Sequence, residues 1–221
     1  MSVAARYGEV LARVARAAER VGRAPHTVKL IAVTKTQPAA AVRAAYAAGA
    51  RVFGENRVQE LREKQAELAD LVDIEWHLVG RLQTNKAKDV VGRVALVHAV
   101  DSVALADALN RRTGAAGLRQ DVLVQVNLSG EGSKAGVVAG ELPALLAHLG
   151  QLPALTCTGL MTLPPPVAGP EDNRAYFGRL AELGAAHGLT ELSMGMTGDF
   201  EVAVAEGATM VRVGTAIFGA R

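Results

Sequence analysis

The amino-acid sequence predicts an α/β fold, a single (β/α)8 barrel (TIM barrel) that spans residues 1–221 and carries an extra N-terminal helix. Segments typical of strands alternate with segments typical of helices along the whole chain, which indicates βαβ units and a parallel sheet. Eight strands in 221 residues fit a closed barrel. Because the chain stops soon after the last strand, we expect the N-terminal helix to replace a missing eighth helix or to cap the barrel bottom. A doubly wound open sheet is the alternative.

The first half of the chain is predicted to hold the N-terminal helix and four strands. The helix from Ser2 to about Gly22 has a rough apolar stripe. The first strand is a short continuous apolar run, as expected for a sheet covered on both faces. The next helix has Pro38 in its first turn and Gly49 just past its end. In order, strands are expected at 29–35, 51–56, 74–80 and 94–100, and helices at 38–48, 57–70 and 84–91.

The second half continues the alternation. Asp101 or Ser102 caps a helix that runs to about Arg112. The strand after it is the most β-branched and apolar of the set, and a polar, glycine-rich loop follows at 129–136. Gly188 follows the helix at 171–187, as is typical of a helix C-terminus. The expected strands are 121–128, 155–163, 191–196 and 209–213, with helices at 140–149, 171–187 and 198–206.

Composition narrows the class of protein. Half of the residues are hydrophobic and the net charge is only +2, which predicts a folded domain without the basic footprint of a nucleic-acid-binding protein. No apolar run is long enough to span a bilayer. The charged N-terminal segment is typical of an amphipathic helix and not of a signal peptide. A single cysteine, Cys157, excludes an intramolecular disulfide, so we expect a cytoplasmic protein. Without an exposed heptad or apolar patch, we expect a monomer.

Lys35 stands at the end of the first strand. Because side chains alternate along a strand, Ile31, Val33 and Lys35 should share one face. A buried ammonium is unfavourable unless it is paired or neutralised. One interpretation is a lysine that extends past the strand end into water. The other is a desolvated amine nucleophile that forms a Schiff base with a carbonyl compound.

Polar residues and glycines follow several other predicted strands. Active sites of such barrels lie at the carboxyl ends of the strands. Each residue alone is equally explained as a turn residue or a helix cap. Their placement on one rim nevertheless predicts a site there. The residues are Asn56, Gly80, Arg81, Asn127, Ser129, Lys134, Met161, Thr162, Thr197, Gly214 and Thr215.

The segments around the last two strands suggest a phosphate site. Barrels often bind phosphate with the loops after strands seven and eight. Glycines allow close approach of the backbone, and hydroxyl groups add donors. Alternation points Arg212 into the mouth of the barrel, unless it forms a structural ion pair. The glycines are Gly195, Gly198 and Gly214, and the hydroxyl residues are Ser193, Thr197 and Thr215.

Three predicted features together suit a phosphorylated aldehyde. They are a lysine at one side of the barrel mouth, a phosphate site at the other side, and an arginine between them. Pyridoxal 5'-phosphate (PLP) is such a compound. Lys35 would form the Schiff base, and Arg212 would face the pyridine nitrogen. Asn56 is a candidate neighbour of the ring. A barrel that binds phosphosugars without a cofactor remains a further interpretation.

The chain resembles the pyridoxal phosphate homeostasis protein family along nearly its full length. The motifs that carry the resemblance are AVTKT at 32–36, FGEN at 53–56, VQE at 58–60, WHLVG at 76–80, LQTNK at 82–86, VQVN at 124–127, GLM at 159–161, LSMGM at 192–196 and VRVGTAIFG at 211–219. The resemblance implies a barrel like the N-terminal domain of alanine racemase, with PLP on Lys35. It also implies phosphate contacts at Ser193, Gly214 and Thr215, and Arg212 near the pyridine nitrogen.

The family resemblance implies a protein that holds PLP, takes part in vitamin B6 homeostasis and hands the cofactor to apoenzymes. The residues favour binding without turnover. An arginine facing the pyridine nitrogen opposes its protonation, which weakens the electron sink. The three tyrosines, Tyr7, Tyr46 and Tyr176, fall on predicted helices and so offer no second base. His77 is either an acid/base candidate or packed beside Trp76, and Lys134 is solvated or a secondary aldehyde site. A weak amino-acid racemase or lyase is the alternative function.

Overall fold

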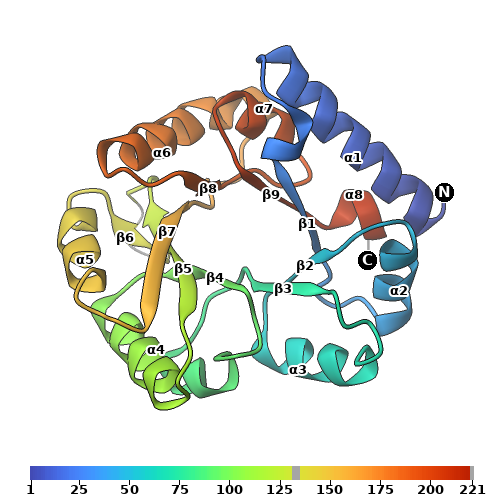
Figure 1. Cartoon of the computed structure of the whole chain (residues 1–221). Coiled ribbons are helices and arrows are strands. Elements are labelled where there is room, and N and C mark those ends of the chain that lie inside the picture. Colours follow the sequence, from blue (N-terminus) through green and yellow to red (C-terminus); the bar gives the residue numbers. More distant parts are fainter. Residues whose placement is uncertain (131–134, 220–221) are drawn as a thin grey trace.

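Eight parallel strands close into a barrel in the computed structural model, which describes residues 1–130 and 135–219 (Figure 1). Every strand of the ring pairs in parallel with its neighbours, and the β4–β5 and β9–β1 pairings complete it. This closure confirms the predicted barrel. The strands of the ring are β1 (Lys29–Val33), β2 (Val52–Glu55), β3 (Glu75–Leu78), β4 (Leu96–Val100), β5 (Gln120–Asn127), β7 (Leu155–Met161), β8 (Glu191–Ser193) and β9 (Met210–Val213).

Helices form an outer ring around the strands (Figure 1). The α-helices are α1 (Val3–Arg20), α2 (Ala39–Ala47), α3 (Val58–Glu67), α4 (Val103–Ala115), α5 (Leu142–Leu149), α6 (Arg174–Ala186), α7 (Phe200–Ala205) and α8 (Thr215–Phe218). Within residues 1–130 and 135–219, the 3-10 helices are η1 (Pro25–Thr27), η2 (Thr84–Asp89) and η3 (Pro170–Asn173).

Side chains of the strands divide into two buried layers. Ile31 and Val33 belong to a small cluster inside the barrel, together with residues of β4, β5, β7 and β9. Leu30 and Ala32, which point the other way, belong to the large cluster between the barrel and the helices. This alternation follows from the strand period of two. In the pairing of β1 with β9, Ile31 is opposite Arg212.

The N-terminal helix completes the outer ring. α1 contacts α2, α7 and α8, so it lies where a full eighth helix would otherwise lie (Figure 1). Its buried face includes Tyr7, Val10 and Val14. The Ser2 hydroxyl accepts from Ala5 N at 3.2 Å as the N-terminal cap. Of the two predicted positions for this helix, the structure shows the first, covering the barrel side.

Several boundaries differ from the predicted ones. β1 ends at Val33, so Lys35 lies in the turn after the strand, and the segment expected as a helix at 84–91 is the shorter 3-10 helix η2. The predicted helix at 171–187 is divided into η3 and α6. β6 (Val137–Val138) was not predicted: it pairs with β5 beside the ring. A two-residue pairing is too short to produce a periodic pattern in the sequence.

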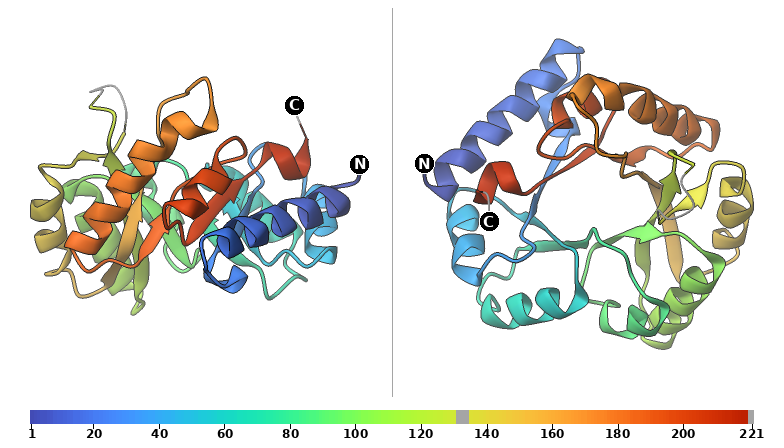
Figure 2. Two further views of the ribbon diagram at one scale, coloured as in Figure 1. Left: turned by 90° about the horizontal axis from the view of Figure 1, so that it is seen from above. Right: turned by 180° about the vertical axis from the view of Figure 1, so that it is seen from behind.

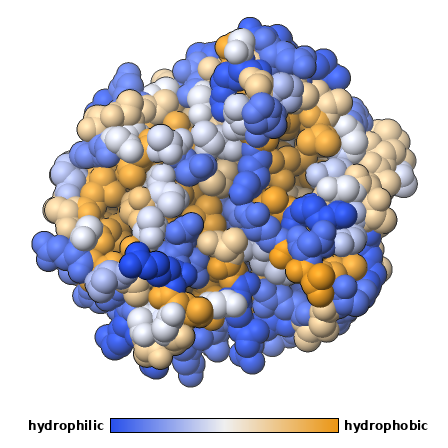
Figure 3. All heavy atoms as spheres, viewed as in Figure 1, coloured by the Kyte–Doolittle hydropathy of each residue, from blue (hydrophilic) through white to orange (hydrophobic). Residues whose placement is uncertain are grey.

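Figures 1 to 3 show the barrel from both ends and from the side. The right panel of Figure 2 shows the end where α8 follows β9, and the left panel shows the barrel from the side. Figure 1 and the space-filling view in Figure 3 show the other end, where both hydrophilic and hydrophobic residues are exposed around the centre. No helix within residues 1–130 and 135–219 is long and apolar enough to cross a membrane.

Candidate functional site

A cavity of about 500 Å³ lies at the carboxyl ends of the strands. It is lined by residues that follow β1, β2, β3, β8 and β9, which are far apart in the sequence. The parallel barrel brings them together because the carboxyl ends of all its strands lie at the same rim. Five of the six predicted site residues line this cavity: Lys35, Asn56, Arg212, Gly214 and Thr215. The sixth, Ser193, does not.

Lys35 lies in the turn that follows β1. Val33 and Lys35 both line the cavity, so the predicted face continues past the strand end. Lys35 is exposed, which agrees with the interpretation of a lysine that extends past the strand end and not with that of a desolvated amine. The next residue, Thr36, has a φ of 62°, which is uncommon for a β-branched residue. Such strained backbone is found mainly at sites where surrounding contacts enforce it.

A buried charged pair holds this turn in place. The ammonium of Lys64 on α3 contacts the Glu55 carboxylate and donates to Thr34 O at 2.5 Å. The Thr34 hydroxyl donates to Glu55 Oε1 at 2.5 Å, and Glu60 accepts from Thr36 N at 2.6 Å. Burial raises the pKa of Glu55, whereas the hydrogen bonds from Lys64 and Thr34 oppose that rise. The chain flanking Lys35 is therefore anchored on both sides. We name Glu55, Lys64 and Thr34 the turn cluster.

Asn56 and Gly80 form the opposite wall. Asn56 follows β2 and lines the cavity together with Gly80 and Arg81, which follow β3. A Cβ at Gly80 would lie 2.3 Å from Asn56 O. Only glycine allows these two backbone segments to pack so closely. The glycine of the WHLVG segment thus fixes the place of Asn56.

Arg212 lies in the wall of the cavity and is only 4% exposed. Its Nη1 donates to Ser193 Oγ at 2.5 Å and its Nη2 donates to Thr162 O at 2.9 Å. Both acceptors are uncharged, so the ion pair considered as an alternative role is not what holds it. Burial lowers the pKa of Arg212 to about 10, while the nearby Asp199 carboxylate opposes that shift. The guanidinium thus carries its charge at neutral pH.

The segments after β8 and β9 bring hydroxyl groups and glycines to the cavity. Thr197, Gly198, Gly214 and Thr215 line one part of it. The Thr197 hydroxyl accepts from Ala216 N at 3.4 Å, which joins the loop after β8 to the start of α8. The buried Asp199 accepts from Met196 N at 2.6 Å and from Asn173 at 2.8 Å. These bonds hold the loop against the helix layer.

Ser193 lies below the cavity. It is fully buried, and besides accepting from Arg212 its hydroxyl lies 2.8 Å from His98 Nδ1. A direct contact between Ser193 and a phosphate stays a prediction. Thr197 has the place at the cavity surface that we expected for a hydroxyl of this segment. Ser193 and Thr197 were predicted on the same face, so the alternation of side chains could not tell which of them reaches the cavity. How deep each residue lies in the barrel depends on the stagger of the strands.

The remaining predictions have mixed outcomes. His77 is buried inside the barrel and contacts His98 and Glu75, so it is not at the cavity. Its contact with His98 differs from both expected roles. Tyr7, Tyr46 and Tyr176 lie on α1, α2 and α6, as predicted. Lys134 lies outside the described residues. We did not anticipate His98, Lys64 or Glu55 as contributors, although the FGEN and VQE motifs contain or flank two of them.

The comparisons with known proteins agree with one another. Residues 7–221 match the family described as alanine racemase, N-terminal domain. The whole chain is 48% identical to the pyridoxal phosphate homeostasis protein of Pseudomonas aeruginosa, covering 96% of that protein. It is 45% identical to the pyridoxal phosphate homeostasis protein of Aquifex aeolicus, again over its full length and covering 99% of that protein.

Solved structures show the same relationship. PipY of Synechococcus elongatus, in a structure with PLP bound, superposes with a TM-score of 0.82 at 46% identity. That match covers 93% of this chain and all of PipY. Alanine racemase from Corynebacterium glutamicum has a TM-score of 0.67 at 20% identity, over 97% of this chain and 61% of the racemase. The racemase likeness concerns the fold alone.

Proposed function

Because the chain belongs to the pyridoxal phosphate homeostasis protein family, we propose that it binds PLP in the cavity at the carboxyl ends of its strands, on Lys35. The observation that carries this proposal is the convergence of an amine, a guanidinium and threonine hydroxyls on one cavity. These groups match the aldehyde, the ring and the phosphate of one small molecule.

The residues present fit this cofactor. A volume of about 500 Å³ is ample for a single substituted pyridine ring with its phosphate. At Gly214 a Cβ would lie 3.2 Å from Val33 O, so a side chain there would crowd the wall beside Lys35. The donor set is cationic and hydroxylic, as an anionic ligand requires.

In this proposal each of the predicted site residues has its own role. When bound, PLP supplies an aldehyde whose carbon forms a C=N bond with a primary amine and releases water. Lys35 provides that amine. Thr197 and Thr215 donate to the phosphate, which the small Gly214 allows to approach. Asn56 packs beside the ring, and Arg212 faces its nitrogen. Ser193 contributes through its bond to Arg212, apart from any direct phosphate contact.

We further propose that this site binds without catalytic turnover. A buried cation beside the pyridine nitrogen opposes its protonation by like-charge repulsion, which weakens carbanion chemistry. All three tyrosines lie on helices of the outer ring, and His77 is enclosed in the barrel. The exposed Lys35 leaves the bound cofactor within reach of an apoenzyme, which suits transfer.

We also propose that the protein is a monomer, and sedimentation equilibrium would check its oligomeric state.

The first experiment is a visible absorption spectrum of the protein mixed with PLP, followed by borohydride reduction and peptide mapping. We expect a yellow protein with the reduced adduct on Lys35. Lys35→Ala should lose it, whereas Lys88→Ala, which removes an exposed lysine outside the cavity, should keep it. A protein that stays colourless with PLP overturns the proposal.

A second experiment separates carrier from enzyme. Loaded protein is mixed with a PLP-dependent apoenzyme, and recovery of the apoenzyme's activity is compared with recovery from free PLP at the same concentration. Failure of any transfer contradicts the carrier role. Exchange of the α-hydrogen of amino acids into deuterated water, lost in Lys35→Ala, would instead establish a weak racemase or lyase.

A further inference from the structure

A chain of polar side chains crosses the interior of the barrel from the end opposite the cavity. It begins at Glu75, passes through His77, His98 and Ser193, and ends at Arg212. The successive contacts are Glu75 Oε1 to His77 Nε2 at 2.8 Å, His77 Nδ1 to His98 Nε2 at 2.9 Å, His98 Nδ1 to Ser193 Oγ at 2.8 Å, and Arg212 Nη1 to Ser193 Oγ at 2.5 Å. We name these five residues the barrel chain.

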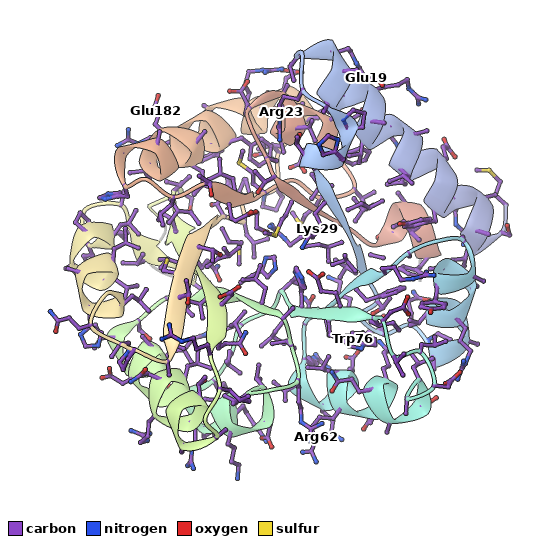
Figure 4. All side chains as sticks on the ribbon, in the orientation of Figure 1. Glu19, Arg23, Lys29, Arg62, Trp76 and Glu182 are labelled. Atoms are coloured by element: carbon purple, nitrogen blue, oxygen red, sulfur yellow. The ribbon has the colours of Figure 1, made fainter. Side chains whose placement is uncertain are left out.

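The chain begins at a second surface cavity, of about 460 Å³, that Lys29, Glu75 and His77 help to line. Lys29 donates to the same Glu75 oxygen at 2.7 Å, and Figure 4 shows Lys29 toward the centre of this end of the barrel. His98 and Ser193 are fully buried and His77 is 1% exposed. The barrel chain therefore connects solvent at one end to the proposed cofactor site at the other, through an interior that also holds the apolar cluster of Ile31, Leu123 and Met161.

An ionised Glu75 and two neutral histidines fix the direction of every hydrogen bond from Glu75 to Ser193. An ionised carboxylate only accepts, so His77 must donate to Glu75 from Nε2. A neutral His77 then accepts at Nδ1, so His98 donates from Nε2. His98 in turn accepts at Nδ1 from the Ser193 hydroxyl.

At the other end, Arg212 can only donate, and Ser193 Oγ accepts from it. The direction derived from Glu75 is compatible with this end, because the Ser193 hydroxyl can accept from Arg212 while it donates to His98, so each contact has one donor and one acceptor. The hydrogen bond from His77, followed by that from Lys29, lowers the pKa of Glu75 to about 2, which keeps that end ionised. Burial lowers the pKa of both histidines, which keeps them neutral.

We propose that His98 and Ser193 are positioning residues for Arg212, and that the barrel chain links the protonation of His77 to the binding of PLP at the cavity. The inference rests on the proposed function only in that Arg212 faces PLP. A proton added to His77 would make Nδ1 a donor, which reverses His98 and leaves the Ser193 hydroxyl hydrogen without its acceptor. It would also add a second positive charge to the interior that holds Arg212.

Charged groups from several strands act on this link. Glu75 and Glu191 favour a charged His77, and Lys29 opposes it. The charged form of His98 is disfavoured by His77, Arg212 and Lys29. Asp199, in the loop after β8, favours the charged form of Arg212. By linkage, PLP binding must shift the pH at which the histidines titrate if those histidines affect its affinity.

The first test needs no cofactor. Ring 15N–1H correlation spectra at pH 7.5 report which nitrogen of each imidazole carries hydrogen. We expect the Nε2–H tautomer for both His77 and His98. An Nδ1–H tautomer or an imidazolium at either position overturns the assigned direction, whatever the protein binds.

The second test measures PLP affinity by absorbance from pH 5.5 to 8.5. We expect affinity to fall in acid, with a midpoint that moves to lower pH in Glu75→Gln and to higher pH in Lys29→Met. Both residues are half-exposed at the end opposite the cavity, so loss of packing gives no reason for opposite shifts. The titration of the PLP phosphate is common to all variants. Equal midpoints, or shifts in the same direction, overturn the link.

The positioning role is tested at His98. His98→Gln keeps an acceptor for Ser193 and a donor for His77, whereas His98→Phe keeps neither. We expect about a tenfold loss of PLP affinity at pH 7.5 in His98→Phe and near wild-type affinity in His98→Gln. Equal losses in both contradict positioning by hydrogen bonds. If the wild-type protein binds no PLP, the proposed function fails, and the tautomer measurement still decides the direction of the barrel chain.

Discussion

Two buried polar clusters hold Lys35 and Arg212, two of the cationic residues that line the cavity, and they do so in opposite ways. In the turn cluster, Lys64 faces the carboxylate of Glu55, and the pair anchors the turn that carries the exposed Lys35. In the barrel chain, Arg212 is itself buried, and its nearest partners are the uncharged oxygens of Ser193 and Thr162. A cation neutralised by its neighbour can only support structure. A cation held by neutral acceptors keeps its charge available for a ligand.

Removing the lysine of the turn cluster should have the largest effect on stability. Lys64→Met leaves the Glu55 carboxylate buried without its counter-ion, which costs about 3–5 kcal/mol of unfolding free energy. Urea titration measures the loss, and Lys88→Met, at an exposed position, is the control. A loss below about 1 kcal/mol would show that the pair is dispensable.

The double variant Lys64→Met, Glu55→Leu separates stability from function. Replacing both charges by apolar groups should recover most of the unfolding free energy. PLP affinity should stay below that of the wild type, because Thr34 and the turn around Lys35 lose their buried partners. Full recovery of both properties would contradict the anchoring role.

Removing the arginine of the barrel chain should do the reverse. Arg212→Met deletes a desolvated cation whose hydrogen-bond acceptors are uncharged, and the nearby Asp199 keeps its bonds from Met196 N and Asn173. We therefore expect the unfolding free energy to change by no more than about 1 kcal/mol. PLP affinity should fall by about tenfold or more, since a charge-assisted contact is lost. Lys64→Met should therefore act mainly on the unfolding free energy, and Arg212→Met mainly on PLP affinity. Urea titration measures the first quantity and absorbance the second.

The barrel chain should also make the fold sensitive to acid. Burial lowers the pKa of His77 and His98 below the value of about 6.5 that histidine has in an unfolded chain. Above that pH neither state is charged. As the pH falls through about 6.5, the unfolded chain takes up protons that the folded one excludes, so stability falls by up to about 1.4 kcal/mol per pH unit for each histidine.

Melting temperatures between pH 7.5 and 5 test this sensitivity. The decline should be shallower in His98→Gln, which removes one of the two titrating groups. Lys88→Met should keep the wild-type slope, because it changes an exposed lysine and leaves both histidines and the buried carboxyl of Glu55 in place. A slope unaffected by His98→Gln would place the acid sensitivity elsewhere.

The contrast between the clusters also shows what the sequence can predict. The alternation of apolar segments was enough for the barrel, and the strand-end position of Lys35, Asn56, Arg212, Gly214 and Thr215 was enough to group them. Those inferences need only strand direction and the period of side chains. The depth of Ser193 was not predictable, because it depends on how far each strand is staggered against the next.

The two buried clusters were less accessible from the sequence for a different reason. Lys64 lies in a charged helical segment whose pattern resembles any solvated helix, and only the packing of α3 on the strand ends reveals its burial. His98 lies within an apolar strand, where a single histidine gives no sign of its partner. Pairings of residues 21 and 95 positions apart, such as His77 with His98 and His98 with Ser193, appear only once the barrel closes.

The smallest effect concerns the strained residue beside Lys35. Thr36 has a φ of 62°, and this left-handed conformation costs a non-glycine residue roughly 1–2 kcal/mol. Thr36→Gly removes that strain but adds backbone entropy to the unfolded chain, so we expect a net gain of at most about 1 kcal/mol in unfolding free energy.

Thr27→Gly is a matched control, because Thr27 lacks the positive φ. Both hydroxyls donate to a nearby backbone carbonyl: Thr27 to Ala24 O at 2.7 Å and Thr36 to Lys35 O at 2.6 Å. Thr27→Gly should therefore be destabilising, and urea titration of the two variants should give opposite signs. The same sign in both would mean that the turn carrying Lys35 is relaxed, and that the turn cluster holds it without strain.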